Sequence, residues 1–248
     1  MKKFGLIGHP IAHSLSPSLF NAAYDGKYAY DLIEGEDFES SYQRFIEEYD
    51  AINVTAPFKE LAFAKADILS EECQSTGATN LLVKTKEGIK AYNSDFLGVR
   101  MWLSELVGSL KGVKILIVGM GGAGKAASVA AESLGMEVIR MNRTVKDNHT
   151  RPLNEFRKCF READIVIYNI PTAIPELKEL ADSDFNTDQP KYILEANYKD
   201  PSLSEILKPF GSKSIYTGGK TWLLYQAVTG YEILTGEKPD LAKMSDVL

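Results

Sequence analysis

The sequence predicts an α/β protein of two domains, and three observations predict it. Its 248 residues, 44% of them hydrophobic, are enough to bury two modest cores. The first half alternates strand-like and helix-like segments, which is typical of a parallel or mixed sheet covered by helices. The second half opens with an apolar run that ends in glycines and continues as an alanine-rich helix, which is the pattern of a βαβ unit.

Apolar runs and turn residues place the elements of the first half. Asp37 can cap the helix that follows it, and Glu87-Gly88 can form the turn of a hairpin. We therefore expect strands over residues 3–7, 28–33 and 51–54, helices from about Pro17 and over 38–48, and a hairpin over 81–92.

The same criteria place the elements of the second half. A helix leads into it, strands follow the glycine-rich unit, and a single terminal helix with apolar spacing ends the chain. These elements are expected at 95–110, at 165–168, 192–195 and 214–216, and at 220–234. The predicted domains are residues 1–94, completed by 219–248, and residues 95–218.

The glycine-rich turn after the apolar run 113–118 predicts a Rossmann-type, doubly wound domain that binds a dinucleotide. Gly119 allows the tight turn off the strand, Gly121 lets the backbone approach a pyrophosphate, and Gly124 lets helix and strand pack closely. The helix N-terminus then offers free N–H groups to the phosphates. The residues of this turn predicted to contact the cofactor are Gly119, Gly121, Gly122, Ala123 and Gly124.

The same letters also satisfy another phosphate-binding pattern. Gly119 through Lys125 match the GxxxxGK of a P-loop, which would indicate a kinase or NTPase. The next residue is Ala126, which has no hydroxyl to hold a magnesium ion where the P-loop requires Ser or Thr. The P-loop interpretation is therefore disfavoured.

The end of the second strand of this unit predicts NADP as the cofactor. An NAD enzyme normally places Asp or Glu there to receive the ribose hydroxyls, but this segment carries no carboxylate. A guanidinium can instead hold a 2′-phosphate by charge-assisted hydrogen bonds. The cofactor-binding residues expected here are Asn142, Arg143, Thr144 and Lys146.

Composition excludes several other classes of function. A net charge of −6 argues against nucleic acid as a partner, and no apolar run is long enough to span a membrane. Cys73 and Cys159 lie far apart in sequence, which favours reduced thiols in a cytoplasmic protein. The three histidines, His9, His13 and His149, show no metal-ligand spacing, so no metal is expected.

Polar residues in the first half mark a second candidate site. Ser14 and Ser16 follow the first strand, where a helix cap or a turn would use at least one of them. Lys59 lies at an expected helix start, where its positive charge opposes the helix dipole. A lysine at this position therefore indicates a role other than stabilising the helix. Asn80 and Asp95 lie at the two ends of the expected hairpin.

Seven segments together resemble the shikimate dehydrogenase family, nearly from end to end of the chain. They are the SLS pair, NVTAPFK, GATN, NSDFLG, GMGGAGKA, NRT and the start of the helix at 218–226. The resemblance implies that Ser14 and Ser16 hold the substrate carboxylate and that Lys59 and Asp95 form the catalytic pair. It also implies substrate contacts for Thr55, Lys59, Asn80, Asp95, Tyr198 and Gln226, and cofactor contacts for Gly219 and Trp222.

The chain departs from the family pattern at three places on the cofactor side. Trp222 stands where the family usually has methionine, and residues 169–175 lack the usual glycine and methionine. Glu195 stands where aspartate is common. The shape of the wall around the nicotinamide is therefore expected to differ.

The resemblance implies reversible conversion of 3-dehydroshikimate and NADPH to shikimate and NADP. One alternative is an NAD-dependent quinate/shikimate dehydrogenase, although the extra hydroxyl of quinate would need room and a partner beside Ser14 and Ser16. Another is a non-catalytic shikimate-binding sensor, which the intact Lys59 and Asp95 disfavour. The expected assembly is a monomer or a homodimer.

Overall fold

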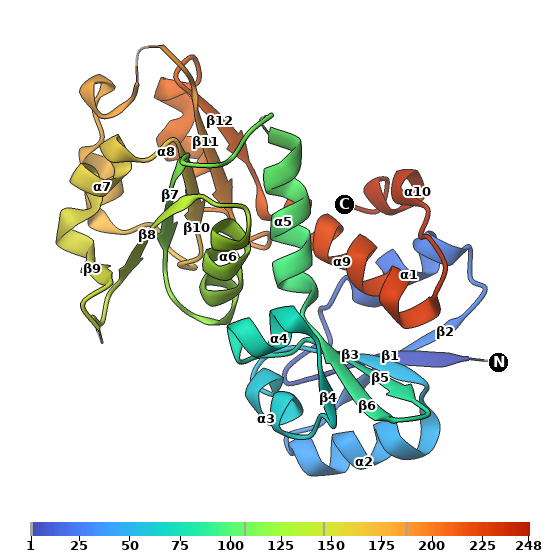
Figure 1. Ribbon diagram of the computed structural model, residues 1–248. Helices are drawn as coiled ribbons and strands as arrows, with labels where there is room; N and C mark the ends of the chain where they lie inside the picture. The colour runs from blue at the N-terminus through green and yellow to red at the C-terminus, as the bar shows by residue number, and fades with distance from the viewer. Residues whose placement is uncertain (1, 107, 146, 187) are drawn as a thin grey trace. The chain divides into compact units, whose positions relative to one another are not determined.

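The computed structural model describes residues 2–106, 108–145, 147–186 and 188–248, which form two compact units, each with its own sheet (Figure 1). The first unit comprises Met1–Gly98 and Leu224–Leu248, and the second comprises Val99–Leu223. The sequence-based division lies at 94/95 and 218/219, within five residues of these limits. No helix of the described residues is long and apolar enough to cross a membrane.

The first unit is built on a mixed six-stranded sheet of order β2-β1-β3-β5-β6-β4. β2, β1 and β3 are parallel, whereas β5 runs antiparallel to both β3 and β6. The strands are β1 (Lys3–Gly8), β2 (Ala29–Glu34), β3 (Ala51–Val54), β4 (Ile68–Leu69), β5 (Leu81–Thr85) and β6 (Gly88–Tyr92).

Helices cover both faces of this sheet. On one face Ile7, Ile52 and Val54 pack with Phe45 and Phe58. On the other, the Phe4 ring lies 5.4 Å from Phe20, which lies 4.9 Å from Tyr231. The helices of this unit are α1 (Ser16–Tyr24), α2 (Phe38–Glu48), α3 (Lys59–Ala64), α4 (Glu71–Thr76), the start of α5 (Ser94–Leu106), the end of α9 (Gly219–Thr235) and α10 (Leu241–Ser245).

One edge of the first sheet collects the segments that carry the predicted substrate residues. β1 and β3 both end there, because they are parallel and in register from Phe4↔Ala51 to Ile7↔Val54. β5 starts there, since it is antiparallel to β3, and Val54 N donates to Asn80 O at 2.8 Å. β6 also ends there, because Tyr92 pairs with Leu81. The topology thus places four chain segments side by side.

The second unit is a fully parallel six-stranded sheet of order β12-β11-β10-β7-β8-β9. Numbered from β7, this is the 3-2-1-4-5-6 order of a doubly wound dinucleotide-binding fold, which confirms the predicted fold class. The strands are β7 (Lys114–Val118), β8 (Glu137–Asn142), β9 (Thr150–Pro152), β10 (Ile165–Tyr168), β11 (Lys191–Glu195) and β12 (Ser214–Thr217).

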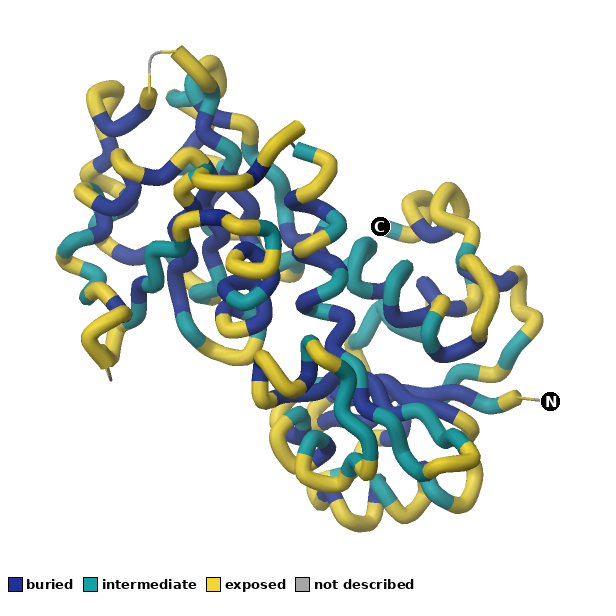
Figure 2. Tube along the Cα trace, in the orientation of Figure 1, coloured by how far each residue is buried: buried dark blue, intermediate teal, exposed yellow. Residues whose placement is uncertain are grey.

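The central strands of this sheet are buried on both faces, as expected for parallel strands (Figure 2). Leu116 and Val166 point into a core shared with Phe156 and Phe160 of α7 (Phe156–Glu162). α6 (Gly122–Ser133) packs on β7, β8 and β10 through buried alanines. The remaining helix is α8 (Ser204–Leu207), and short 3-10 turns occur at Leu153–Glu155, Pro175–Glu179, Asp182–Asp184 and Lys208–Phe210.

Two sequence-based expectations about helices were wrong. α5 ends at Leu106 rather than at Leu110, because Gly108 follows and Leu110 accepts a turn hydrogen bond from Val113 N at 3.1 Å. The terminal helix is not single, since α10 follows α9. Asp240 caps α10 by accepting from Lys243 N at 3.1 Å, and Met244 is fully buried. A five-residue helix is too short to show a hydrophobic period.

Lys191, at the start of β11, is only 2% exposed. Its Nζ donates to Ala163 O and lies 4.9 Å from the centre of the Phe160 ring. Burial lowers the pKa of Lys191 from 10.5 to about 8, and the nearby Asp164 opposes this shift. The folded chain therefore disfavours the ammonium form.

We expect Lys191 to make stability depend on pH. Between about pH 8 and 10.5 the unfolded chain keeps a proton that the folded chain has released, so the stability contributed by this residue rises with pH. The free energy of unfolding of wild type, relative to Lys191→Met, should rise by about 3 kcal/mol across this window. Urea unfolding of both proteins below and above the window measures it; a constant difference would contradict the prediction.

Candidate functional site

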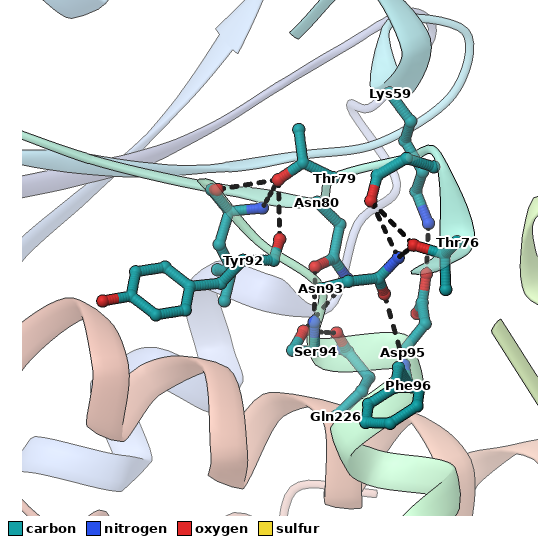
Figure 3. Close-up of polar contacts among 12 residues, drawn as sticks. Lys59, Thr76, Thr79, Asn80, Tyr92, Asn93, Ser94, Asp95, Phe96 and Gln226 are labelled. Atoms are coloured by element: carbon teal, nitrogen blue, oxygen red, sulfur yellow. Dashed lines mark hydrogen bonds and ion pairs between the residues drawn. The ribbon is translucent and has the colours of Figure 1, made fainter. Parts of the chain in front are cut away.

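Lys59 and Asp95 form an ion pair in the first unit (Figure 3). Lys59 Nζ donates to Asp95 Oδ2 at 2.5 Å, and their side chains are 26% and 16% exposed. Lys59 is the first residue of α3, whose preceding Phe58 is buried among apolar side chains and anchors the helix start. Asp95 lies in the first turn of α5, where a negative charge suits the helix dipole. The pair can hold a proton at an enclosed position without leaving either charge unpaired.

Asn93 fixes where Asp95 lies. Its Oδ1 accepts from Phe96 N at 3.2 Å, so it caps α5. Its Nδ2 donates to Thr76 Oγ1 at 3.1 Å and to Ala78 O at 3.0 Å (Figure 3). The start of α5 is thereby tied to the end of α4, and Asp95 is held two residues beyond a buried anchor.

Asn80 and Gln226 meet at Ser94, beside the ion pair (Figure 3). Ser94 N donates to Asn80 Oδ1 at 2.7 Å, and Asn80 Nδ2 donates to Ser94 Oγ at 3.0 Å. Ser94 Oγ in turn donates to Gln226 Oε1 at 3.1 Å. Four of the predicted substrate residues, Lys59, Asn80, Asp95 and Gln226, therefore lie together in this unit.

Ser14, Ser16 and Thr55 follow β1 and β3 at the same sheet edge. Ser14 Oγ donates to Ser16 Oγ at 3.1 Å and accepts from Ser16 N at 3.2 Å, so the two hydroxyls converge. Neither serine is the N-cap of α1. That position is Leu15, and no side chain caps the helix. A Cβ on Gly8 would lie 2.4 Å from Thr55 Cγ2, so only glycine leaves room for Thr55 there.

Tyr231, on α9, connects this serine loop with Gln226. Its hydroxyl donates to Ser16 O at 3.1 Å. Burial raises the pKa of the Tyr231 phenol well above its usual value, although a hydrogen bond with the side chain of Ser16 opposes the shift. The phenol therefore remains a hydrogen-bond donor, and α9 contacts the loop after β1 five residues beyond Gln226.

The glycine-rich turn in the second unit combines close packing at one glycine with open backbone at two others. A Cβ on Gly124 would lie 1.9 Å from Gly119 O, so helix and turn contact each other directly. A Cβ on Gly121 or Gly122 would meet nothing within 4 Å. The backbone at the N-terminus of α6 is therefore open, which a pyrophosphate contact requires. The contacts of Gly119, Gly121, Gly122, Ala123 and Gly124 with a cofactor remain predictions.

The end of β8 carries the residues expected to distinguish the cofactor. Asn142 Oδ1 accepts from Met120 N at 3.4 Å, and its Nδ2 donates to Thr144 O at 3.1 Å, so Asn142 joins the strand end to the glycine turn. Arg143 and Thr144 are exposed. Lys146 lies outside the described residues. The strand end thus presents an accessible guanidinium and no carboxylate among residues 141–145.

Tyr198, Gly219 and Trp222 also belong to the second unit. Tyr198 is half-buried in the loop that follows β11, and Trp222 is buried. A Cβ on Gly219 would lie 2.5 Å from Ala196 O, so α9 begins in direct contact with this loop. Gly219 therefore has a packing role besides the predicted contact with the cofactor.

Sequence reasoning missed two polar residues near these sites. Ser94 escaped notice because a serine before Asp95 is typical of an ordinary helix start. Asn169 lies at the end of β10, and a Cβ on Gly124 would be 3.4 Å from its Nδ2. Both polar side-chain atoms of Asn169 are buried and lack a hydrogen-bond partner among the described residues. The position next to the glycine turn fits a contact with a bound dinucleotide.

Comparisons with known proteins agree with this arrangement. Residues 6–82 match the family described as "Shikimate dehydrogenase substrate binding domain", and residues 89–187 match "D-isomer specific 2-hydroxyacid dehydrogenase, NAD binding domain". The chain is 30% identical to a shikimate dehydrogenase (NADP(+)) of Caldanaerobacter subterraneus subsp. tengcongensis, over 95% of this chain and 92% of that protein. It is also 30% identical to the Aquifex aeolicus shikimate dehydrogenase (NADP(+)), over 94% and 91%.

A solved structure shows the same likeness over the whole chain. The shikimate 5-dehydrogenase of Thermus thermophilus, in complex with NADP(H) and shikimate, superposes with a TM-score of 0.81 at 25% identity. The match covers 100% of this chain and 98% of that one.

A matched pair of glycine substitutions should separate folding from dinucleotide binding. We expect Gly124→Ala to lower the free energy of unfolding by about 1–3 kcal/mol or more, because its methyl group would collide with Gly119 O. Gly121→Ala should leave stability within about 0.5 kcal/mol, since the space is open, yet weaken dinucleotide binding by blocking the backbone. Thermal unfolding and cofactor titration test both; equal destabilisation by the two variants would contradict this geometry.

Proposed function

Because the chain belongs to the shikimate dehydrogenase family, we propose that it catalyses the reversible NADPH-dependent reduction of 3-dehydroshikimate to shikimate. The observation that supports this most directly is the Lys59–Asp95 ion pair beside Asn80, Ser94 and Gln226. An enclosed lysine and carboxylate can exchange a proton with an alcohol or ketone oxygen, and the neighbouring amides can bind hydroxyl groups. This is the chemistry that a secondary alcohol dehydrogenase requires.

Lys59 moves the proton in this proposal. During reduction its ammonium donates a proton to the substrate carbonyl oxygen, and during oxidation Nζ receives the proton of the substrate hydroxyl. Asp95 holds the ammonium in place through the 2.5 Å hydrogen bond and balances its charge. The two side chains exchange protons as one coupled unit.

The other predicted substrate residues bind and orient the ring. Asn80, Gln226 and Thr55 are assigned to the ring hydroxyls. Ser14 and Ser16 are assigned to the carboxylate, because their hydroxyls converge after β1, and a carboxylate accepts two such donors well. Tyr198 is assigned to the same substrate on the basis of the family resemblance.

The glycine turn, Asn142, Arg143 and Thr144 would hold NADP. The cofactor supplies the hydride when it is bound. The open backbone at Gly121 and Gly122 receives the pyrophosphate, and Arg143 reads the 2′-phosphate. Gly219 and Trp222 are assigned to the nicotinamide end. The matched family description names NAD, but a strand end without a carboxylate favours the phosphorylated cofactor.

The cytoplasm is the setting that we propose for this activity. Cys73 and Cys159 are free and buried, and burial raises the pKa of both thiols, so they remain protonated and unreactive. A protein that keeps two free thiols suits a reducing compartment. A monomer or homodimer is the expected assembly.

The absorbance of the reduced nicotinamide tests the function directly. Purified protein is assayed with shikimate and with quinate, each against NADP and NAD. Turnover of shikimate with NADP is expected to exceed the other three combinations. Turnover only with quinate and NAD would indicate the alternative dehydrogenase, and binding of shikimate without turnover would indicate a sensor.

Lys59→Ala should lower kcat by about 10²- to 10⁴-fold and change shikimate affinity far less, because proton transfer matters most in the transition state. Lys59→Arg should not restore the rate, since a guanidinium keeps its proton at any working pH. Lys65→Ala is the control, because Lys65 is an exposed lysine at the other end of α3. Survival of the Lys59→Ala rate within a few-fold would remove Lys59 from the mechanism.

Arg143→Ala should weaken NADP binding by about 1.5–3 kcal/mol, the range for hydrogen bonds to charged groups, and leave NAD binding nearly unchanged. Arg44→Ala on α2 serves as the control, since it removes the same charge from the first unit. Titration of both cofactors decides the assignment. Equal losses for NAD and NADP would mean that Arg143 does not read the 2′-phosphate.

A further inference from the structure

We propose that Ser94 is a positioning residue that fixes the orientation of both the Asn80 and the Gln226 amide groups and thereby sets which hydrogen-bond partners they offer to the substrate. The inference rests on the proposed function, because it assigns Ser94 a part in recognising the ring hydroxyls. Ser94 itself is fully buried and does not need to touch the substrate.

The backbone N–H of Ser94 fixes the orientation of the Asn80 amide. The backbone N–H of Ser94 can only donate, and it donates to Asn80 Oδ1 at 2.7 Å. The oxygen of the Asn80 amide must therefore face the start of α5, and its nitrogen must face the hydroxyl of Ser94. Asn80 Nδ2 indeed donates to Ser94 Oγ at 3.0 Å. One backbone group thus selects one of the two possible orientations of the Asn80 amide.

The hydroxyl of Ser94 fixes the orientation of the Gln226 amide in turn. Ser94 Oγ already accepts from Asn80, so its single hydrogen is available for another acceptor. That hydrogen is donated to Gln226 Oε1 at 3.1 Å. The carbonyl end of the Gln226 amide is thereby turned towards Ser94 (Figure 3), which leaves the NH2 end to donate to other groups.

Close packing keeps these groups from rearranging. A Cβ on Gly98 would lie 2.6 Å from Gln226 N, and a Cβ on Gly230 would lie 3.1 Å from Ser94 Oγ. Helices α5 and α9 therefore approach each other through glycines on both sides of the Ser94–Gln226 bond. The hydroxyl has little space to turn to another acceptor.

The fixed orientation complements the ion pair. The carboxylate of Asp95 accepts hydrogen bonds, whereas the NH2 group of Gln226 donates them. A hydroxyl has one hydrogen to donate and lone pairs to accept. Asp95 would then accept from a substrate hydroxyl and Gln226 would donate to one, whereas a reversed Gln226 amide would present a second acceptor.

Ser94→Ala tests this role. The variant should lower kcat/KM for shikimate about 10- to 100-fold, as expected for two lost hydrogen bonds between neutral groups, and leave the KM for NADP unchanged. Thr235→Val is the matched control, because Thr235 has a buried hydroxyl on α9 that lies within hydrogen-bond distance of the Tyr24 hydroxyl and of Tyr231 O. It should lower the melting temperature without changing kinetics with shikimate.

A double-mutant cycle separates positioning from simple packing. If Ser94 acts partly through Gln226, Ser94→Ala should cost clearly less in a Gln226→Ala background than in wild type. Additive losses would contradict the transfer to Gln226. A lowered melting temperature with unchanged kcat and KM for shikimate would overturn the proposal as a whole. Wild type without shikimate turnover would instead refute the proposed function, so the two failures are distinguishable.

Discussion

The antiparallel pairing of β5 with β3 is the constraint on which the candidate active site depends. In a parallel sheet only the carboxyl ends of strands meet at one edge. Here the β5–β6 hairpin brings its beginning, at Asn80, and its end, at Asn93, to the edge where β1 and β3 finish. Val54 N and Asn80 O fix this register at 2.8 Å. A slip of β5 by one residue against β3 would turn Leu81 and Leu82 each to the other face of the sheet, and it would displace Asn80 and Ser94 together from the ends of β1 and β3.

The C-terminal part of α9 completes the arrangement that this edge begins. Gln226 and Ser94 are 132 residues apart in sequence but share a hydrogen bond, and Tyr231 contacts the loop after β1 at Ser16. The close approach at Gly98 lets α5 and α9 make these contacts. Asn80, Asp95 and Gln226 therefore lie within one compact unit, although they come from both ends of the chain.

Much of the fold was predictable because strong local signals agree with the final packing. The strands at 51–54 and 165–168 and the helix at 38–48 have the predicted bounds, since apolar runs and the Asp37 cap define them without long-range help. The ion pair of Lys59 with Asp95 was foreseen only through the family resemblance. The roles of Ser94 and Asn169 depend on contacts between atoms that are far apart in the sequence. The spacing of residues along the sequence does not predict such contacts.

Two of the departures from the family pattern, Glu195 and the 169–175 loop, are both bonded to the segment that follows β11. Glu195 is fully buried, and its carboxylate accepts from Ser202 N, Leu203 N and the hydroxyl of Tyr216, so it holds the far end of the loop that carries Tyr198.

The hydroxyl of Tyr168 stabilises the loop at 169–175, which lacks the usual glycine. Tyr168 donates to Thr172 O at 2.7 Å and accepts from Ile174 N at 3.0 Å. Asn197 then joins the two loops by donating to Pro171 O at 3.0 Å. Glu195 and the 169–175 loop are thus each hydrogen-bonded to a neighbouring segment of the second unit, which gives the loop that carries Tyr198 a defined backbone.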